Sequence, residues 1–384
     1  MIWQIVDVRA VWIKEFASAL SRQVPTLGWL PKFSAASLIH NHEEEFACDD
    51  PPLTIRTFPL QRGFARFPFK ILAQEKKRIT RRLRERTSSP TKSPLILTSP
   101  HFADVAAEWS GPVIYYVTDF FPAYRDEPHF IRALDTKMCA AATVVCPNSQ
   151  RIADYLNSEA QCPIEKIAII PNATRAANIF QNMPTAPGEL PYPIADLPRP
   201  IAGVIGNLAE NTDWILLRNA IERTPWLSWV FVGPTDMAIQ DARQDEARRF
   251  LMQNRGSVRF VGEKSYSELR DYARSFDVAI LPYQKREPTY SGSSTRFYEH
   301  LAACRPMIAT RGFAELLHKE PLLRLIDNAN EMRAALEDLH VSNFSDGHEE
   351  LRWHASQTET WENRASKMIA ALSERFAIGR EAAA

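Results

Sequence analysis

Short apolar segments alternate with longer segments of helical periodicity along the whole chain of 384 residues. The apolar segments are rich in Val and Ile, which is typical of buried strands in a parallel sheet with helices on both faces. Helical stretches such as 214–223 and 266–274 lie between them. Strands are expected at 3–8, 53–58, 95–99, 113–118, 143–146 and 167–170, and again at 201–206, 229–233, 258–262, 278–282, 307–310 and 323–327. The pattern therefore predicts an α/β protein with two doubly wound, Rossmann-like domains.

One stretch separates the two halves of this pattern. Residues 181–200 contain six prolines and show neither helical nor strand periodicity, which is typical of a stiff linker. We therefore expect an N-terminal domain over 1–180, the linker, a C-terminal domain over 201–350 and a last helical segment over 351–384. A chain of this length is too long for one ordinary core, which agrees with two domains.

Composition and charge narrow the class of protein. A hydrophobic content of 45% and a charged content of 24% are those of a soluble globular protein, and the net charge of zero argues against a general nucleic-acid binder. The five cysteines have no metal-binding spacing, which suits a reducing compartment. Charged residues interrupt the first apolar segment, and no later uncharged apolar run reaches about 18 residues. We expect a cytoplasmic protein that does not cross a membrane.

The stretch 291–310 combines a polar turn, a helix and a strand. Ser293 or Ser294 can cap the helix, whose first N–H groups and partial positive charge favour an anion. Arg296 adds a full positive charge, and Glu299 lies three residues later on the same helical face. A nucleoside diphosphate needs this pair, because the cation binds the phosphates and the carboxylate binds the ribose hydroxyls. The alternative is a capped surface helix whose Arg and Glu pair with each other.

The run SSTRFYEHLAACRP from Ser293 to Pro306 resembles the S-P-L-K-L-Y-E-Y-L-A-A-G-K-P signature of GT-B glycosyltransferases, close to family 4, the glycosyl transferases group 1. Ser294 replaces the usual Pro, Cys304 replaces the usual Gly, and Ser291 stands where many relatives have the first Glu of an E-x7-E motif. The resemblance implies two Rossmann-like domains that face each other across a cleft, with the last helix returning to the first domain. Further stretches match in the expected order at 204–208, 231–234, 260–262 and 275–283.

The resemblance also implies a donor site at the carboxyl ends of the strands of the second domain, where doubly wound sheets bind ligands. Taken alone, each of these turns has an alternative interpretation as an ordinary tight turn between a strand and a helix. The turn after the first strand of this domain, at 204–208, carries no basic residue. Arg296, with Lys285 or Arg286, is therefore expected to hold the diphosphate. The expected donor-binding residues are Gly206, Asn207, Gly262, Glu263, Lys264, Pro282, Tyr283, Ser293, Ser294, Thr295, Arg296 and Glu299.

Two residues of the first domain are catalytic candidates beside Arg296. Asp119 ends a strand that resembles the "vYdvvDd" run of some relatives, and it can orient the sugar or an acceptor hydroxyl, or only cap the next turn. His101 follows the preceding strand at the same edge, where a structural role is the alternative. Arg296 would stabilise the negative charge that builds on the departing diphosphate. Since no D-x-D motif is present, we expect no obligatory metal or other cofactor, and the resemblance implies retention of anomeric configuration.

The sequence thus predicts a hexosyltransferase-type glycosyltransferase of polysaccharide biosynthesis that uses a nucleoside-diphosphate sugar. Its acceptor would be a glycan, a lipid-linked molecule or a small molecule. Two alternatives stay open. One is a nucleotide-sugar 2-epimerase of similar architecture, and the other is a non-catalytic nucleotide-sugar-binding subunit of a polysaccharide assembly.

The stretch 62–86 is strongly basic, with ten Lys or Arg residues and two Glu residues. Phe64, Phe67 and Phe69 lie at its start. Cationic residues next to aromatic ones favour an anionic lipid surface, so we expect peripheral attachment to a membrane through this stretch. The alternative is a solvated helix face.

Overall fold

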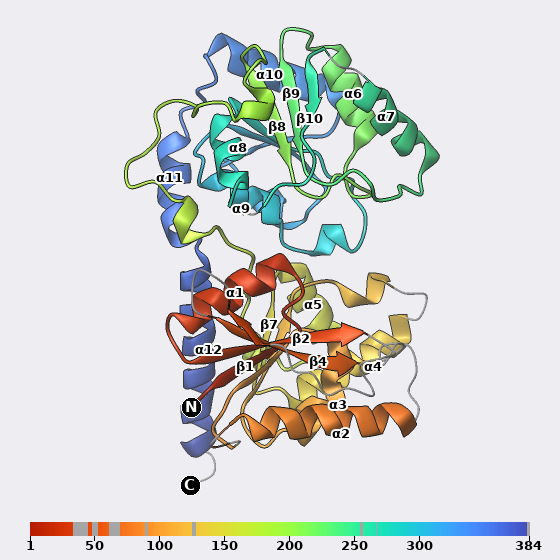
Figure 1. The fold of residues 1–384 in the computed structure, drawn as a ribbon, viewed down its shortest axis with the longest axis vertical. Helices are drawn as coiled ribbons and strands as arrows, with labels where there is room; N and C mark the ends of the chain where they lie inside the picture. The colour runs from red at the N-terminus through yellow and green to blue at the C-terminus, as the bar shows by residue number, and fades with distance from the viewer. Residues whose placement is uncertain are drawn as a thin grey trace. The chain divides into compact units, whose positions relative to one another are not determined.

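The computed structural model describes residues 1–33, 45–47, 53–60, 70–87, 89, 91–124, 128–253, 256–265 and 267–381. It divides into two compact units (Figure 1). Unit 1 comprises Met1–Asn172 together with Trp361–Ala384, and unit 2 comprises Ala173–Thr360. None of the helices in the described part of the chain combines the length and the hydropathy that crossing a bilayer requires.

Unit 1 is built on a seven-stranded sheet in the order β3-β4-β2-β1-β5-β6-β7. All neighbouring strands are parallel except β3 and β4. The winding of the chain reverses between β1 and β5, which makes their carboxyl ends the switch point of this sheet. The strands are β1 (Trp3–Val6), β2 (Thr26–Phe33), β3 (Glu45–Ala47), β4 (Thr54–Leu60), β5 (Leu95–Leu97), β6 (Val113–Val117) and β7 (Val144–Pro147).

Helices cover both faces of this sheet. The core on one face includes Ile79, Phe102 and Met138, and on the other face Phe16 packs 6.4 Å from Trp361 between ring centroids. The helices are α1 (Val11–Ser21), α2 (Lys70–Glu85), α3 (Ala103–Glu108), α4 (Pro128–Ala141), α5 (Gln150–Ser158) and α12 (Trp361–Glu381).

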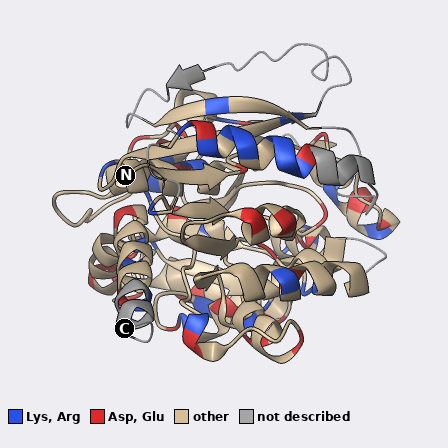
Figure 2. Ribbon diagram, turned by 90° about the horizontal axis from the view of Figure 1, so that it is seen from below, with Lys and Arg blue, Asp and Glu red and all other residues tan. Residues whose placement is uncertain are grey.

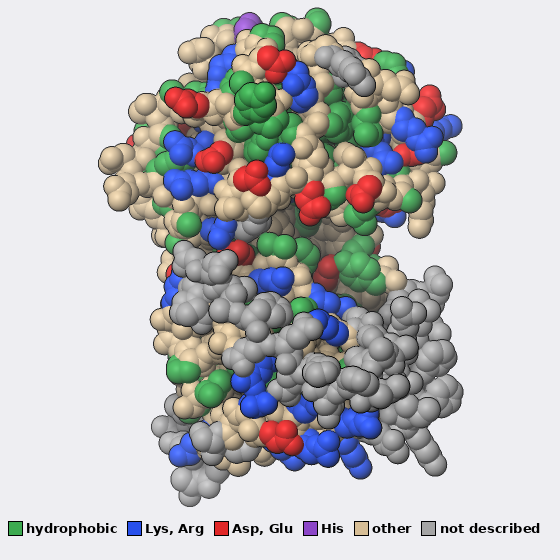
Figure 3. Space-filling view, viewed as in Figure 1, with side chains coloured by type: hydrophobic (Ala, Val, Ile, Leu, Met, Phe, Trp, Pro, Cys, Tyr) green, Lys and Arg blue, Asp and Glu red, His purple; other side chains and the backbone are tan. Residues whose placement is uncertain are grey.

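Helix α2 carries most of the basic stretch. Its inner side buries Ile79 and Leu83 in the core, and its outer side exposes mainly Lys and Arg. Figure 2 shows the blue bands along this helix, and Figure 3 shows blue side chains gathered on the same part of unit 1. Arg62, Phe64, Arg66, Phe67 and Phe69 lie outside the described residues.

Unit 2 contains a six-stranded, all-parallel sheet in the order β10-β9-β8-β11-β12-β13. Its strands are β8 (Ile201–Ile205), β9 (Ser228–Val232), β10 (Val258–Phe260), β11 (Val278–Leu281), β12 (Met307–Thr310) and β13 (Arg324–Ile326). Its helices are α6 (Trp214–Glu222), α7 (Ala242–Gln253), α8 (Leu269–Ser275), α9 (Thr295–Leu301), α10 (Ala329–Val341) and α11 (Glu349–Thr358). The winding reverses between β8 and β11, at the middle of the sheet.

The predicted α/β class with two doubly wound sheets is confirmed. The prediction of a strand at 167–170 is wrong, since this segment forms only an isolated bridge between Ile167 and Val145. Strands β2 and β3 were not predicted. The single helical segment expected near the carboxyl end is two helices, α11 and α12, that break at Glu359 and Thr360.

The Pro-rich stretch 181–200, predicted as a linker, packs on unit 2. Gly188 donates its N–H to the carbonyl of Arg274 at 2.7 Å. Ile194 and Leu197 are buried among residues of β8 and α8. Burial of these apolar side chains holds the stretch against the unit.

Candidate active site

The switch point of unit 2 lies between the carboxyl ends of β8 and β11. Gly206 follows β8 with a φ of +119°, which a residue with a Cβ rarely adopts, and its N–H donates to the carbonyl of Val232 at 2.9 Å. Pro282 and Tyr283 follow β11. Neighbouring strand ends at a switch point form the ligand-binding crevice of doubly wound sheets, and the turns that begin at Gly206 and Pro282 lie at this edge.

Arg296 lies at this switch point and is only 5% exposed. Its Nη2 donates to the carbonyl of Asn207, and its guanidinium carbon lies 4.8 Å from the ring centroid of Tyr283. Within the described residues, Nη1 has no hydrogen-bond partner and no carboxylate lies within ion-pair distance of the guanidinium. Burial lowers the pKa of Arg296. A buried cation without a counter-charge is unfavourable, and an anion bound there would relieve it.

The start of α9 is capped as the sequence predicts. The hydroxyl of Ser294 accepts a hydrogen bond from the N–H of Phe297 at 3.3 Å, and it lies 3.0 Å from the hydroxyl of Tyr283. The N–H of Ser294 donates to Glu315 at 2.8 Å, and the hydroxyl of Tyr298 donates to the same carboxylate at 2.5 Å. Helix α9 is only seven residues long, the N–H of its N-cap residue Ser294 donates to Glu315, and that of Phe297 donates to Ser294. Arg296 therefore carries most of the positive charge here.

Sequence reasoning missed Glu315. It follows β12, and the rule that side chains after parallel strands meet at one sheet edge would have drawn attention to it.

His300 lies one turn after Arg296 and is 1% exposed. Among the described residues, neither ring nitrogen has a hydrogen-bond partner. Burial and the charge of Arg296 lower the pKa of His300 to about 3, so the ring is neutral near pH 7. Apart from the position of His300 in the helix, the sequence gave no signal that this ring would be buried and neutral.

Other predicted donor residues are placed less centrally. Glu299 is 6% exposed on α9, one turn after Arg296. Gly262, Glu263 and Lys264 follow β10, which is separated from β8 by β9. Pro282 follows β11, Ser293 lies just before α9, and Thr295 is the first residue of α9.

The two further cations proposed for the diphosphate have partners of their own. Arg286 donates to Glu210 at 2.5 Å, and Glu210 also accepts from the N–H of Gln240 at 2.8 Å. The Nζ of Lys285 lies 5.0 Å from the ring centroid of Tyr290. Arg296 is therefore the central cation of this edge.

In unit 1, His101 and Asp119 follow the neighbouring strands β5 and β6. Asp119 accepts from the N–H of Phe120 at 3.0 Å and from the hydroxyl of Tyr124. His101 Nδ1 lies 3.0 Å from the hydroxyl of Ser99. The contact between Asp119 and Phe120 is the turn cap that was the alternative reading of this residue.

Asp7 joins the same edge, although sequence reasoning placed it inside a strand. It follows β1, which pairs with β5, and its φ is +78°. Arg9 Nε donates to its carboxylate at 2.7 Å. Asp7, His101 and Asp119 thus follow three neighbouring strands at one edge of the sheet.

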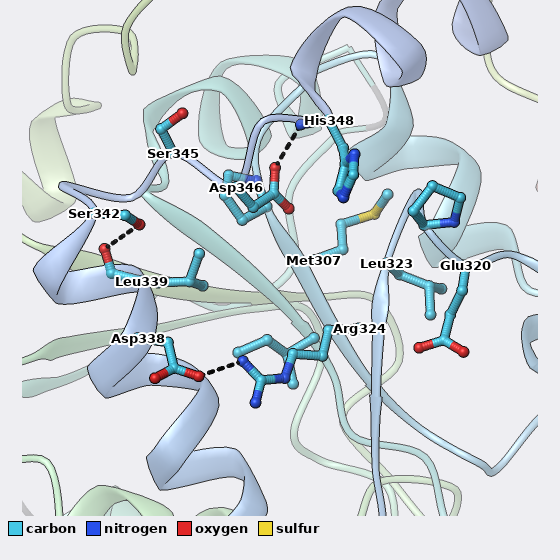
Figure 4. Close-up of a pocket in the computed structure, with 13 residues that line it drawn as sticks. Met307, Glu320, Leu323, Arg324, Asp338, Leu339, Ser342, Ser345, Asp346 and His348 are labelled. Atoms are coloured by element: carbon cyan, nitrogen blue, oxygen red, sulfur yellow. Dashed lines mark hydrogen bonds and ion pairs between the residues drawn. The ribbon is translucent and has the colours of Figure 1, made fainter.

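A cavity of about 350 Å³ opens at the opposite, amino edge of the unit 2 sheet (Figure 4). Met307 and Arg324, the first residues of β12 and β13, line it, and Arg324 pairs with Asp338 at 2.7 Å. None of the predicted site residues lines this cavity. In the described part of the chain, no group of three or more His, Cys, Asp or Glu side chains is placed to hold a metal ion.

Part of the chain matches a family of known proteins. Residues 199–341 match the model of a family described as "Glycosyl transferases group 1". A stretch of 164 residues is 23% identical to a putative teichuronic acid biosynthesis glycosyltransferase, TuaH, of Bacillus subtilis (strain 168). This match covers 42% of the chain and 40% of the relative, so the chain spans less than half the length of that curated protein.

Solved structures resemble the whole chain. Alr3699/HepE of Anabaena, in complex with UDP and glucose, has a TM-score of 0.68 at 14% identity and covers 97% of this chain and 99% of its own. Sucrose-phosphate synthase of Thermosynechococcus elongatus has a TM-score of 0.71 at 15% identity, and the match covers 98% of this chain and 100% of the synthase chain. An α,α-trehalose-phosphate synthase of Burkholderia xenovorans, in complex with glucose-6-phosphate, has a TM-score of 0.67 at 13% identity, with coverages of 97% and 99%. These likenesses show that the fold is GT-B.

Proposed function

We propose that this chain, whose residues 199–341 match the model of the glycosyl transferases group 1, transfers a sugar from a nucleoside-diphosphate sugar to an acceptor hydroxyl. The observation that carries the proposal is Arg296, a buried cation at the switch point of unit 2 that lacks a carboxylate partner among the described residues. A diphosphate supplies the negative charge that this environment favours. The group 1 match covers the same strands and turns.

In this proposal the donor lies along the carboxyl edge of β8, β11 and β12. Arg296 binds the diphosphate, and Glu299 accepts hydrogen bonds from the ribose hydroxyls. The backbone at Gly206 and Asn207 and the residues around Tyr283 and Ser294 shape the crevice. Glu263 and Lys264 would contact only a more distant part of the donor, because β9 separates their strand from β8.

The proposed reaction needs little covalent machinery from the protein. The bond between the anomeric carbon and the diphosphate oxygen breaks, and the electron pair leaves with the diphosphate. The acceptor oxygen bonds to the anomeric carbon and gives its proton to an oxygen of the departing diphosphate. A fixed guanidinium stabilises the charge that grows on the leaving group, so we propose catalysis without an obligatory metal. Asp119 and His101 of unit 1 are the residues we propose for orienting the acceptor hydroxyl, with retention of configuration as the proposed outcome.

The similar proteins suggest which substrates to test first. The Anabaena structure holds UDP and glucose, and the Burkholderia structure holds glucose-6-phosphate. The Bacillus relative is named for the biosynthesis of teichuronic acid. We therefore propose a UDP-sugar as the first donor and a glycan of polysaccharide biosynthesis, free or lipid-linked, as the first acceptor.

The test incubates the protein with labelled UDP-, GDP-, ADP- and dTDP-sugars, with and without acceptors. Transfer or slow donor hydrolysis is expected from the parent and should be lost in Arg296→Gln. Arg333→Gln, an exposed residue paired with Glu337 on α10, is the matched control for the loss of one positive charge. Epimerised product would instead identify an epimerase, and binding without turnover would identify a non-catalytic subunit.

We also propose that unit 1 attaches to anionic membranes through α2. The supporting observation is its outer side, which exposes Lys77, Arg78, Arg81 and Arg84. Each such residue near an anionic surface contributes about 1 kcal/mol of attraction. In liposome flotation, changing Arg78, Arg81 and Arg84 to Glu should abolish binding to anionic vesicles. An equal charge reversal in unit 2, at Arg311, Arg324 and Arg333, is the control. A protein that stays soluble at low salt would contradict the proposal.

A further inference from the structure

A small lysine-lined cavity lies in unit 1, whereas the donor site is proposed in unit 2. Its volume is about 200 Å³, and it is lined by Lys76, Lys77, Asp104, Ala107, Glu108 and Lys137. These residues come from α2, α3 and α4, which pack side by side on one face of the sheet. Blue and red segments of ribbon in Figure 2 mark the Lys or Arg and the Asp or Glu positions.

Two of the lysines already hold an anionic group. The Nζ of Lys76 contacts one carboxylate oxygen of Asp104, and the Nζ of Lys137 contacts the other. The side chain of Lys76 is 16% exposed and that of Asp104 31%, so both are half-sheltered from water. Burial alone would raise the pKa of Asp104, but the hydrogen bonds and charges of Lys137 and Lys76 hold that pKa below its ordinary value. The carboxylate therefore stays ionised near neutral pH.

The positive charge of the cavity exceeds what its own carboxylates neutralise. Three ammonium groups face Asp104 and the rim residue Glu108. The exposed side of α2 next to the cavity adds Arg78, Arg81 and Arg84. Lysine ammonium groups are mobile point charges on flexible stems, so Lys76 and Lys137 can release Asp104 and turn toward an incoming anion.

We propose that this junction of α2, α3 and α4 is a binding site for a phosphate group. Lys76 and Lys137 bind its oxygens, Lys77 closes the rim, and Asp104 is the internal anion with which the phosphate competes. A phosphate monoester carries a charge of about −1.5 to −2 near pH 7 and offers three acceptor oxygens, more than a carboxylate can present. The volume of the cavity accommodates a phosphate and the first atoms of the group that carries it.

The phosphate can belong to a soluble compound or to a lipid headgroup, and the chemistry of recognition is the same for both. The basic side of α2 favours a lipid surface near the cavity. Asp104 follows the acceptor-side candidate His101 by three residues, which favours a phosphorylated sugar. None of its residues is among those proposed for the donor nucleotide, which all belong to unit 2.

The experiment titrates the full chain with inorganic phosphate and with glycerol 3-phosphate by calorimetry. The double variant Lys76→Gln/Lys137→Gln should weaken binding about 10-fold or more, as expected for the loss of two charge-assisted hydrogen bonds. Asp104→Asn should strengthen binding several-fold, because the competing charge is gone. Arg81→Gln, which removes one positive charge from the exposed side of the same helix, should change the affinity less than about 2-fold.

Asp104→Asn separates this proposal from a purely structural ion-pair cluster. In a structural cluster this variant only lowers the unfolding temperature, and no variant changes phosphate affinity. That result, or an effect of Arg81→Gln as large as that of Lys76→Gln/Lys137→Gln, would overturn the site. UDP binding, measured in parallel, should be unchanged in every variant, so a failure of the donor site is recognised separately.

Vesicles distinguish the two sources of phosphate. Phosphatidic acid carries a phosphate monoester, and phosphatidylserine at matched surface charge carries none. If the ligand is a headgroup, Lys76→Gln/Lys137→Gln should weaken attachment to phosphatidic acid vesicles much more than to phosphatidylserine vesicles. Equal weakening on both, together with no binding of the soluble phosphates, would reduce the cavity to part of a diffuse basic surface and refute the proposal.

Discussion

Gly206 lies directly against Arg296: a Cβ built on Gly206 would come within 2.4 Å of the Nε atom of Arg296. Gly206, which follows β8, and Arg296, which lies on the helix after β11, are thus in close contact at the switch point. The absence of a side chain at 206 is what allows the guanidinium to lie beside the turn that follows β8.

Gly206→Ala should therefore weaken nucleotide binding by displacing Arg296. The substitution forces a Cβ into a contact that the guanidinium must leave, and it strains a φ of +119° by about 1–3 kcal/mol. We expect about a 10-fold loss of affinity for the nucleoside diphosphate that the parent binds, measured by calorimetry. Gly347→Ala is the matched control, because its φ is +75° but nothing lies within 4 Å of the added Cβ. Equal affinity in Gly206→Ala and the parent would show that Arg296 does not contact the ligand.

Glu299→Gln should weaken binding through the ribose. Loss of hydrogen bonds to a charged acceptor costs about 1.5–3 kcal/mol, which is roughly a 10- to 100-fold loss of affinity. If the parent binds UDP, it should prefer UDP over 2′-deoxy-UDP, and the variant should bind both nucleotides equally. The unfolding temperature serves as the control for stability. A preference for UDP that survives in the variant would assign the ribose to another residue.

His300→Gln should reduce the loss of unfolding free energy that occurs as the pH falls. The pKa of His300 is about 3 in the folded chain and about 6.5 when unfolded, so the unfolded state takes up the proton first as the pH falls. This contribution to stability is fully present above pH 6.5 and is lost progressively toward pH 3. Between pH 6.5 and 4 the parent should lose about 3 kcal/mol of unfolding free energy that the variant retains. Denaturant titrations at both pH values measure it, with the exposed His354→Gln as the control. An equal loss of unfolding free energy in parent and variant would mean that the ring of His300 is accessible to water.

Glu315→Gln should loosen the start of α9. The carboxylate accepts from the N–H of Ser294 and the hydroxyl of Tyr298, and a glutamine amide can satisfy only one of these donors well. We expect a loss of about 1–3 kcal/mol of unfolding free energy. Nucleotide affinity should fall in the same variant, because Arg296 is the second residue of that helix. Glu320→Gln, an exposed neighbour on the same loop, should change neither quantity.

Most strands were predictable because their apolar runs are uninterrupted. Strand β2 was not, since its sequence TLGWLPKF contains Gly28 and Pro31, which both argue against a central strand. The structure shows why they are tolerated. The ladder between β1 and β2 ends at the pair Val6–Trp29, so Pro31 has a neighbour only on the β4 side, where it is opposite Phe58. Gly28 packs against Ile55, whose Cγ1 would be 3.3 Å from an added Cβ.

At the candidate site, local signals were sufficient for the cap at Ser294 and for the position of Arg296 on α9. Glu315 and Asp7 escaped because their roles depend on where distant loops return to the sheet edge. Glu315 meets Ser294 across 21 positions of sequence, and nothing in the spacing announces that contact. Burial of the ring of His300 is likewise a property of packing around α9, not of its helical pattern.

The two ends of unit 2 meet, since the N–H of Thr174 donates to the carbonyl of Glu359 at 2.8 Å and Thr174 bridges Thr360. Unit 2 is therefore a continuous insertion within unit 1, whose last helix is translated only after the insertion is finished. On the ribosome, a nascent chain can complete unit 2 while unit 1 still lacks α12, the helix whose Trp361 packs on Phe16. A chain that ends at residue 360 would thus lack α12 of unit 1, while all of unit 2 would be present.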